Sequence, residues 1–419
     1  MAGRLVVLGL GYVGLPLAQA AARAGWRVDG FDVSSRVVQS LNAGASHVDD
    51  LSDADVAEML ELGFRASTDP GVVADADVAV ICVPTPLGDG GAPDLDAVRA
   101  AADTVGRGLR PGTTVVLEST SYPGTTEGVV LPILHAQGHT HGEDFLLAFS
   151  PERVNPGFPE YGITNTPKLV GGITPAATDA AASFYATFVQ DVVSMSGTRE
   201  AETAKLLENT YRHVNIALVN EMAVLCHELG IDIWEVIRGA STKPFGFQAF
   251  RPGPGVGGHC IPIDPNYLGY EVRRSLGREF RFVELAQEIN HAMPAYIVGR
   301  IADLLNEGAK ALRGSSVLAL GVTYKPDIAD QRESPALVVG QILLDKGADL
   351  RFHDPFVTRW DLGGIALDRV EDLLAAAADA DIVVLLQDHR SYDLDAIAAA
   401  APLFFDTRGV SRAPGVVRL

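Results

Sequence analysis

The sequence is poor in cysteine, in long apolar runs and in short-period repeats. It has three cysteines among 419 residues, and the spacing of Cys82, Cys226 and Cys260 suits neither a disulfide framework nor a zinc site. We therefore expect a reduced intracellular protein with no bound metal. No apolar run reaches the ~20 residues that a membrane-spanning helix needs, so we expect no membrane partner.

Positive charge is also scarce. The chain has 33 Lys and Arg residues against 53 Asp and Glu residues, which gives a formal net charge of -20. An acidic surface repels polyanions and excludes nucleic acid and anionic membrane as main partners, but backbone N–H groups can still bind a small anionic ligand. The start of the chain lacks the basic segment and longer apolar stretch of a signal peptide, so we expect a cytoplasmic location.

Strand-like and helix-like segments alternate at both ends of the chain. The strand-like segments cover residues 4–8, 26–32, 78–83, 114–118, 316–320, 350–353, 382–386 and 403–406. The helix-like segments cover residues 15–24, 35–42, 54–62, 95–108, 335–346 and 370–378. Such alternation predicts parallel sheets with helices on both faces.

The middle of the chain is mainly helical. Residues 200–229 contain no proline and no glycine and predict one long helix, and residues 282–306 predict a second. Residues 242–265 are rich in proline and glycine, which is typical of a functional loop. We predict the α/β fold class, with two Rossmann-like doubly wound domains joined by a long central helix. The predicted domains are residues 1–197, 198–308 and 309–419.

A glycine-rich turn follows the first strand-like segment. Gly9, Gly11 and Gly14 match the G-x-G-x-x-G pattern, and Asp32 ends the next strand at the spacing of a ribose-binding carboxylate. The pattern predicts a dinucleotide whose pyrophosphate lies at a helix N-terminus. Asp32 favours NAD because its charge would repel the 2′-phosphate of NADP, while the nearby Arg36 leaves NADP open. FAD is a competing ligand, and the pattern also occurs in turns that bind nothing.

The loop over residues 253–265 places glycines and prolines before Cys260, and Asp264 follows four positions later. Glycines let a ligand approach the backbone and leave N–H groups for phosphate or sugar oxygens. We interpret Cys260 as a nucleophile, with an inert core thiol as the alternative, whereas Cys82 and Cys226 suit small core residues. Asp264 either accepts a hydrogen bond from a water or sugar hydroxyl or caps the following turn.

Together, the glycine turn, the long helix carrying Lys205 and Asn209 and the thiol loop resemble the UDP-glucose/GDP-mannose dehydrogenase family over essentially the whole chain. Further matching motifs are Tyr122-Pro123-Gly124-Thr125-Thr126, Ser150-Pro151-Glu152-Arg153-Val154, Glu208-Asn209-Thr210-Tyr211-Arg212 and Thr242-Lys243-Pro244-Phe245-Gly246-Phe247. These motifs are most similar to the branch that acts on UDP-N-acetylhexosamines, and within it to members that oxidise UDP-N-acetylglucosamine.

The resemblance implies an NAD-dependent four-electron oxidation of the sugar C6 alcohol to a carboxylate. The Cys260 thiolate adds to the C6 aldehyde, the thiohemiacetal is oxidised to a thioester, and water releases the uronic acid. The resemblance also implies an N-terminal NAD-binding domain, a C-terminal UDP-sugar-binding domain and a homodimer built by the central helix.

The resemblance assigns three sets of residues. The catalytic set is Cys260, Lys205, Asn209, Asp264, Thr120 and Glu152. The cofactor-binding set is Gly9, Gly11, Tyr12, Val13, Gly14, Asp32, Arg36, Pro84, Thr85 and Thr120. The substrate-binding set is Glu152, Arg153, Val154, Lys205, Asn209, Arg212, Phe250, Gly257, Gly258, Lys325, Arg332 and Arg408.

Some roles and the substrate stay open. Without the resemblance, Lys205 suits a helix-surface lysine paired with Glu202 or Glu208. Pro156 stands where glucose-type members have a glutamate acting on the water, so the hydrolytic step must use Glu152, Thr120, Asp264 or another water route. The substrate is UDP-N-acetylmannosamine or UDP-glucose if it is not UDP-N-acetylglucosamine, and the non-enzymatic alternative is a nucleotide-sugar-binding protein without turnover.

Overall fold

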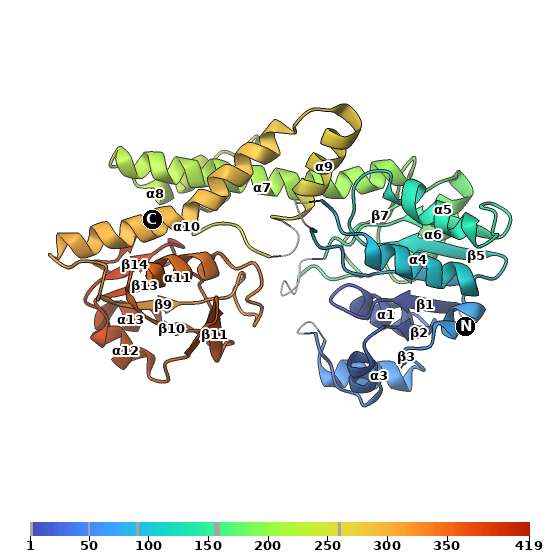
Figure 1. The fold of residues 1–419 in the computed structure, drawn as a ribbon, viewed down its shortest axis with the longest axis horizontal. Helices are drawn as coiled ribbons and strands as arrows, with labels where there is room; N and C mark the ends of the chain where they lie inside the picture. Colours follow the sequence, from blue (N-terminus) through green and yellow to red (C-terminus); the bar gives the residue numbers. More distant parts are fainter. Residues whose placement is uncertain (1–2, 49–50, 89–91, 155–159, 259–260) are drawn as a thin grey trace. The chain divides into compact units, whose positions relative to one another are not determined.

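The computed structural model describes residues 3–48, 51–88, 92–154, 160–258 and 261–419. The chain folds into two compact units (Figure 1), and each is described by itself. Unit 1 comprises Met1–Glu208 and Asn266–Arg278, and unit 2 comprises Asn209–Pro265 and Glu279–Leu419. The α/β fold class is confirmed, with a long central helix, α7 (Thr198–Glu228), between the two sheet regions of the sequence. The division into three domains stays a prediction.

The sheet of unit 1 has, over the described parts of the chain, the strand order β3-β2-β1-β4-β5-β6-β7-β8. Its strands are β1 (Arg4–Leu8), β2 (Arg27–Phe31), β3 (Arg65–Ser67), β4 (Val78–Ile81), β5 (Thr113–Leu117), β6 (Phe145–Phe149), β7 (Lys168–Gly172) and β8 (Val192–Ser194). All neighbouring strands are parallel except β6 and β7. The strand order reverses between β1 and β4, which makes the carboxyl ends of these strands the expected binding edge.

Helices cover both faces of this sheet. They are α1 (Gly14–Arg23), α2 (Ser35–Asn42), α3 (Asp53–Glu61), α4 (Asp96–Gly108), α5 (Leu131–Ala136) and α6 (Pro175–Tyr185), with the short turns η1 (Pro70–Asp75) and η3 (Thr126–Val130). Helix α9 (Asp264–Leu276) begins with two residues of unit 2 and continues in unit 1. Alternate β1 residues pack in two different cores: Leu5 and Val7 with α1 and α6, and Val6 and Leu8 with α4. Burial on both faces explains why these strands read as continuous apolar runs.

Unit 2 contains a second parallel sheet of order β10-β9-β13-β14-β15 among its described residues. Its strands are β9 (Ser316–Leu320), β10 (Asp349–His353), β13 (Ile382–Leu385), β14 (Phe404–Asp406) and β15 (Val417–Arg418), and β11 (Arg359–Leu362) forms a hairpin with β12 (Ile365–Asp368). Its helices are α8 (Ile233–Ala240), α10 (Arg281–Glu307), α11 (Pro335–Asp345), α12 (Leu373–Asp379) and α13 (Leu394–Ala400). In the described part of the chain, every helix is too short or too polar to cross a bilayer.

Some predicted segments differ from the structure at their ends, and the strands β3, β6, β7, β8, β11, β12 and β15 were not predicted. The helix predicted over residues 370–378 begins at Leu373, because the Asp372 side chain accepts a hydrogen bond from the N–H of Ala375 and caps it. Strand β7 was missed because it ends in Gly171 and Gly172, and glycine disfavours strands. A Cβ on either glycine would collide with neighbouring backbone, so the close packing of this strand requires them.

Candidate active site

The glycine turn after β1 combines two glycines that the fold requires with one that leaves space. Gly9 has φ of +92°, and a Cβ there would lie 2.5 Å from the carbonyl oxygen of Cys82. A Cβ on Gly14 would overlap the Gly9 carbonyl. Gly11 has no described atom within 4 Å of such a Cβ, so a ligand can approach its backbone. This arrangement fits the pyrophosphate of a dinucleotide.

Asp32 holds this turn from the end of β2. Its carboxylate accepts hydrogen bonds from the N–H of Leu10 at 3.0 Å and of Ser34 at 2.8 Å, and it is partly exposed. Helix α1 begins next to the turn, and its N-cap residue Val13 makes no side-chain capping bond in the described structure. An anion therefore meets the positive end of the helix dipole there, as a dinucleotide requires. Arg36 is exposed on α2.

Other predicted cofactor residues follow the neighbouring strands β4 and β5. The carbonyl of Thr85 accepts a hydrogen bond from the hydroxyl of Tyr267 on α9, next to Pro84. Thr120 is partly buried two residues after Glu118, in the loop that ends β5. Since β1, β4 and β5 are adjacent and parallel, their carboxyl ends meet at one edge of the sheet. The cofactor residues predicted from the sequence therefore share that edge.

A buried charged cluster lies beside this edge. The Nζ atom of Lys168, on β7, is 2.9 Å from Glu118 Oε1 and 3.5 Å from Glu152 Oε2. The Tyr185 hydroxyl donates to the same Glu118 oxygen at 2.5 Å, and the Cys82 thiol lies 3.8 Å from the other. The side chains of Lys168 and Glu118 are 4% and 0% exposed, and that of Glu152 is 15% exposed. Glu152 is thus the member of the cluster closest to solvent.

This environment shifts the pKa values of the two carboxyl groups, Glu118 and Glu152, in opposite directions. Burial raises the pKa of Glu118, although Lys168 opposes the shift. Burial also acts to raise the pKa of Glu152, but the Lys168 ammonium and the N–H of Val154 outweigh it and hold that pKa below its usual value. Burial raises the pKa of the Cys82 thiol well above its usual value, which suits the inert core residue predicted from the sequence. Glu152 is therefore the carboxylate and Glu118 the group that takes a proton more readily.

The two carboxylates nearest to Lys205 along α7, those of Glu202 and Glu208, bind groups other than the Lys205 ammonium. Glu202 accepts hydrogen bonds from the N–H of Gly124, and from the N–H and hydroxyl of Thr126 at 2.9 and 2.7 Å. Glu208 binds the Arg153 guanidinium at 2.8 Å. Lys205 itself is buried. These contacts do not support the interpretation of Lys205 as a surface lysine paired with Glu202 or Glu208.

In unit 2, the α9 N-terminus carries the predicted catalytic acid. The carboxylate of Asp264 is buried and accepts a hydrogen bond from the side-chain amide of Asn209 on α7. Phe250 packs edge-on against Tyr211, with the ring centres 5.8 Å apart, and Arg212 is exposed. The structure therefore brings two residues of the predicted catalytic set, Asn209 and Asp264, into contact. Cys260 and Pro156 lie outside the described residues.

The loop before Cys260 packs on the segment that follows β9. A Cβ on Gly257 would lie 2.6 Å from the carbonyl oxygen of Glu333, and a Cβ on Gly258 would lie 2.7 Å from the ring of Tyr324. Close packing of the chain on itself requires these glycines, a reason beyond the ligand approach expected from the sequence. A Cβ on Gly253 would lie 2.5 Å from the Arg408 guanidinium, so this predicted substrate residue lies beside the loop.

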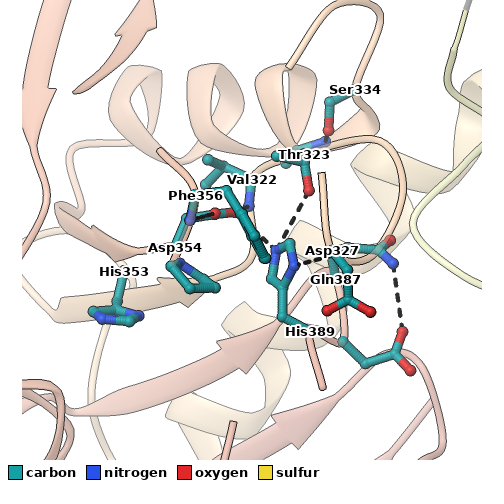
Figure 2. A network of polar contacts seen from close by, with 12 residues as sticks. Val322, Thr323, Asp327, Ser334, His353, Asp354, Phe356, Gln387 and His389 are labelled. Atoms are coloured by element: carbon teal, nitrogen blue, oxygen red, sulfur yellow. Dashed lines mark hydrogen bonds and ion pairs between the residues drawn. The ribbon is translucent and has the colours of Figure 1, made fainter. Parts of the chain in front are cut away.

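The predicted substrate residues of the β9 segment are held by a network that the sequence reasoning missed (Figure 2). His389 is buried, and its Nε2 lies 3.0 Å from Asp354. Its Nδ1 accepts a hydrogen bond from the N–H of Asp327 at 2.9 Å, which assigns the proton of a neutral ring to Nε2. Lys325 lies two residues before Asp327, and Arg332 binds Asp330 at 2.7 Å. The network thus anchors the segment that carries both cations.

Sequence reasoning also missed Lys168, Glu118 and Tyr185. The available signal was a lysine at the start of the apolar run Lys168-Leu169-Val170, since lysine is rarely buried unless it is paired. Its partners are distant in sequence, so the run alone does not name them. The cluster is visible only once β5, β6 and β7 are aligned.

Comparison with known proteins identifies the family of the whole chain. Residues 3–189 match the NAD binding domain of the UDP-glucose/GDP-mannose dehydrogenase family, residues 199–292 its central domain and residues 318–413 its UDP binding domain. A UDP-N-acetyl-D-mannosamine dehydrogenase of Pyrococcus horikoshii is 34% identical over 422 residues, covering 99% of this chain and 97% of the relative. An NDP-N-acetyl-D-galactosaminuronic acid dehydrogenase of Ralstonia nicotianae is 36% identical, covering 96% and 95%.

The fold comparison agrees with the sequence comparison. The solved structure of UDP-D-ManNAc dehydrogenase from Pyrococcus horikoshii superposes with a TM-score of 0.90 at 33% identity, covering 99% of this chain and 98% of that chain. The glycine turn and Asp32 fit the cofactor of the matched NAD binding domain. The chain therefore belongs to the UDP-glucose/GDP-mannose dehydrogenase family of NAD-dependent UDP-sugar dehydrogenases.

Proposed function

We propose that this protein oxidises C6 of a UDP-N-acetylhexosamine to the carboxylate, with UDP-N-acetylglucosamine and UDP-N-acetylmannosamine as the two leading substrates. The observation that carries the proposal is the near full-length similarity to a UDP-N-acetyl-D-mannosamine dehydrogenase. UDP-N-acetylglucosamine is the substrate that the sequence motifs favour. UDP-glucose is the runner-up.

The proposed chemistry has two oxidations and one hydrolysis. C6 loses a hydride and its hydroxyl loses a proton, which gives the aldehyde, and the Cys260 sulfur adds to that carbonyl carbon. The thiohemiacetal then loses a second hydride and becomes a thioester, and water breaks the C–S bond to release the acid. NAD, when bound, accepts the hydrides.

The proposed roles follow from charge and hydrogen bonding. Lys205 stabilises negative charge on the C6 oxygen, since a buried ammonium acts strongly in a water-poor site. Asn209 orients Asp264, and the hydrogen bond between their side chains supports this pairing. Thr120, Glu152 and Asp264 are the proposed groups around the hydrolytic water.

The proposed substrate contacts lie in both units. In unit 1, the Arg153–Glu208 ion pair and the Val154 N–H bond to Glu152 support a fixed backbone for sugar contacts. In unit 2, Lys325, Arg332 and Arg408 are the proposed ligands of the UDP group. The anchored β9 segment supports this assignment, because phosphate ligands need fixed cations.

We also propose a homodimer through α7. In unit 2, Tyr211, Leu218 and Leu225 recur every seven residues along α7, and Leu229, one residue past the end of α7, follows Met222 by the same interval. All five are between 38% and 72% exposed. A stripe with this repeat is typical of a helix that packs on another helix. Light scattering at micromolar concentration tests the proposal, and a monomeric mass contradicts it.

The decisive experiment measures NADH formed per nucleotide sugar consumed. UDP-N-acetylglucosamine, UDP-N-acetylmannosamine, UDP-N-acetylgalactosamine and UDP-glucose are compared under the same conditions, with Cys260→Ala as the control. We expect two NADH per sugar with one N-acetylhexosamine and no acid from the variant. Turnover of UDP-glucose alone would select the runner-up, and no NADH from any sugar would favour a binding protein without turnover.

A further inference from the structure

Lys168 is a buried cation that the family-based assignments leave without a role. It lies at the start of β7, between the carboxylates of Glu118 and Glu152, and its ammonium also lies 5.2 Å from the ring centre of Tyr185. The two carboxylates face it from different strands, because Glu118 follows β5 and Glu152 follows β6. Lys168 therefore pairs both with a fully buried carboxylate, Glu118, and with the more exposed carboxylate of Glu152.

A purely structural role explains this cluster poorly. Burying an ammonium with two carboxylates costs desolvation free energy, and well-packed apolar side chains in such places are often as stable or more so. The pattern of contacts is also unequal. Glu118 accepts only from buried side chains, those of Lys168, Tyr185 and Cys82, whereas Glu152 accepts from Lys168 and from the backbone N–H groups of Arg153 and Val154. The Glu152 side chain is 15% exposed and that of Glu118 is 0% exposed, so Glu152 is the carboxylate that a group outside the cluster can approach.

We propose that Lys168 is a positioning residue that holds Glu152 anionic and oriented, so that this carboxylate accepts the proton of the water that cleaves the thioester. The water oxygen bonds to the C6 carbonyl carbon, its proton passes to Glu152, the C–S bond breaks and the sulfur leaves as thiolate. This inference rests on the proposed function. It identifies the base that acts where Pro156 replaces the glutamate of glucose-type members.

The electrostatic surroundings of Glu152 support this division of roles. The titratable or charged groups that act on it and on its partner Glu118 are Lys168 from β7, Glu118 from the end of β5, Cys82 from the end of β4, Tyr185 from α6 and Lys205 from α7. Lys168 is the largest of the charges that lower the pKa of Glu152. Removing its charge therefore raises that pKa, and the base form is populated only at higher pH.

The test is a pH profile of turnover together with the pre-steady-state burst of NADH, in the full-length protein with its best UDP sugar. On the acidic side of the pH profile the steady-state rate falls as Glu152 becomes protonated, and we call this part of the profile the acid limb. We expect Lys168→Met to shift the acid limb to higher pH by ~1–3 pH units. On that limb the steady rate falls about tenfold or more. The burst of two NADH per site persists and the thioester accumulates on Cys260, because only the hydrolytic step is slowed. Lys168→Arg restores the wild-type limb.

Two further variants keep the test decisive if Lys168→Met does not fold. Glu118→Gln leaves the ammonium to Glu152 alone, so we expect the acid limb to move to lower pH. Tyr185→Phe is the matched control, since it alters the same buried cluster without changing its charge, and we expect the wild-type limb. An unshifted limb in Lys168→Met overturns the inference, and so does an unshifted limb in Glu118→Gln where Lys168→Met does not fold. A burst lost together with the steady rate overturns it as well. A wild-type protein that forms no NADH overturns the proposed function and this inference with it.

Discussion

The two sheets of the molecule turn in the same way after their first strands. Gly9 follows β1 and Gly321 follows β9, both with positive φ, +92° and +75°. A Cβ on Gly9 would collide with the carbonyl of Cys82, just past β4, and a Cβ on Gly321 would collide with the carbonyl of Gln387, just past β13. In both units the first strand therefore ends against its neighbour across the reversal of strand order.

An aspartate completes the turn in both units. The N–H of Leu10 donates to Asp32 at 3.0 Å, and the N–H of Val322 donates to Asp354 at 2.8 Å. Each aspartate directly follows the second strand of its sheet, and its other oxygen accepts from the N–H two residues further on. The two units thus share one local structure made of a glycine, an amide and a carboxylate.

The difference lies in what meets the aspartate next. In unit 1 the glycine turn leads directly into α1, and Asp32 remains partly exposed. In unit 2 a long segment separates Gly321 from α11, and Asp354 is buried against His389 (Figure 2). The same carboxylate position is therefore partly open to solvent in one unit and fixes a buried segment in the other. Comparing Asp32 with Asp354 therefore distinguishes a carboxylate that the fold needs from one that is proposed to bind a ligand.

The largest loss of stability that tests this comparison is expected when Asp354 is replaced. Asp354→Ala removes the acceptor of two buried donors, the N–H of Val322 and the Nε2–H of His389, and of the partly buried N–H of Phe356. We expect the unfolding free energy of unit 2 to fall by ~3–5 kcal/mol, since each orphaned buried donor costs about 1–3 kcal/mol. Hydrogen exchange read over unit 2 in denaturant measures it. A loss no larger than that of Asp32→Ala in unit 1 contradicts the comparison.

Substitutions at Gly9 and Gly11 test, within one turn, the difference between a glycine that the fold requires and a glycine that is proposed to admit the ligand. Gly9→Ala places a Cβ at positive φ against a carbonyl, so we expect unit 1 to lose ~1–3 kcal/mol of stability. Gly11→Ala meets no described atom within 4 Å, so we expect unchanged stability and NAD binding weakened by about tenfold or more. Thermal unfolding and calorimetric titration with NAD separate the two. Tight NAD binding by Gly11→Ala would show that the pyrophosphate does not use this space.

The smallest expected effect is a pH dependence of opposite sign in the two units. Burial raises the pKa of Glu202 in unit 1 from 4.5 to about 7, and burial lowers the pKa of His213 in unit 2 from 6.5 to about 4. Folded Glu202 keeps a proton that the unfolded chain releases, so its contribution to stability is lost as pH rises from 4.5 to about 7. The unfolded chain protonates His213 first, so that contribution grows as pH rises from about 4 to 6.5.

Each contribution changes by no more than about 1.4 kcal/mol per pH unit, the linkage slope of a single proton. Melting curves between pH 4 and pH 8 for wild type, Glu202→Gln and His213→Asn measure them. We expect each variant to lose only its own slope. A wild-type slope retained in Glu202→Gln contradicts the assignment to Glu202.

Much of the fold was predictable because its signals are local. The alternation of segments predicted both parallel sheets, and the spacing of Gly9, Gly11 and Asp32 predicted a dinucleotide edge that the contacts of these residues fit. Lys168 was not predictable, since β7 carries two glycines and the partners of the lysine come from β5 and β6. His389 was missed for a similar reason: it joins Asp354 and Asp327 across three strands, and its own segment carries no motif.

The central claim is that the sheet of unit 1 binds NAD while the anchored segment of unit 2 binds the UDP sugar. Calorimetric titration of NAD and of UDP into wild type, Asp32→Ala and Lys325→Ala tests it most directly. We expect Asp32→Ala to weaken NAD by about tenfold or more and to change UDP by less than about twofold, with the reverse for Lys325→Ala. Equal weakening of both ligands by either variant would contradict the claim.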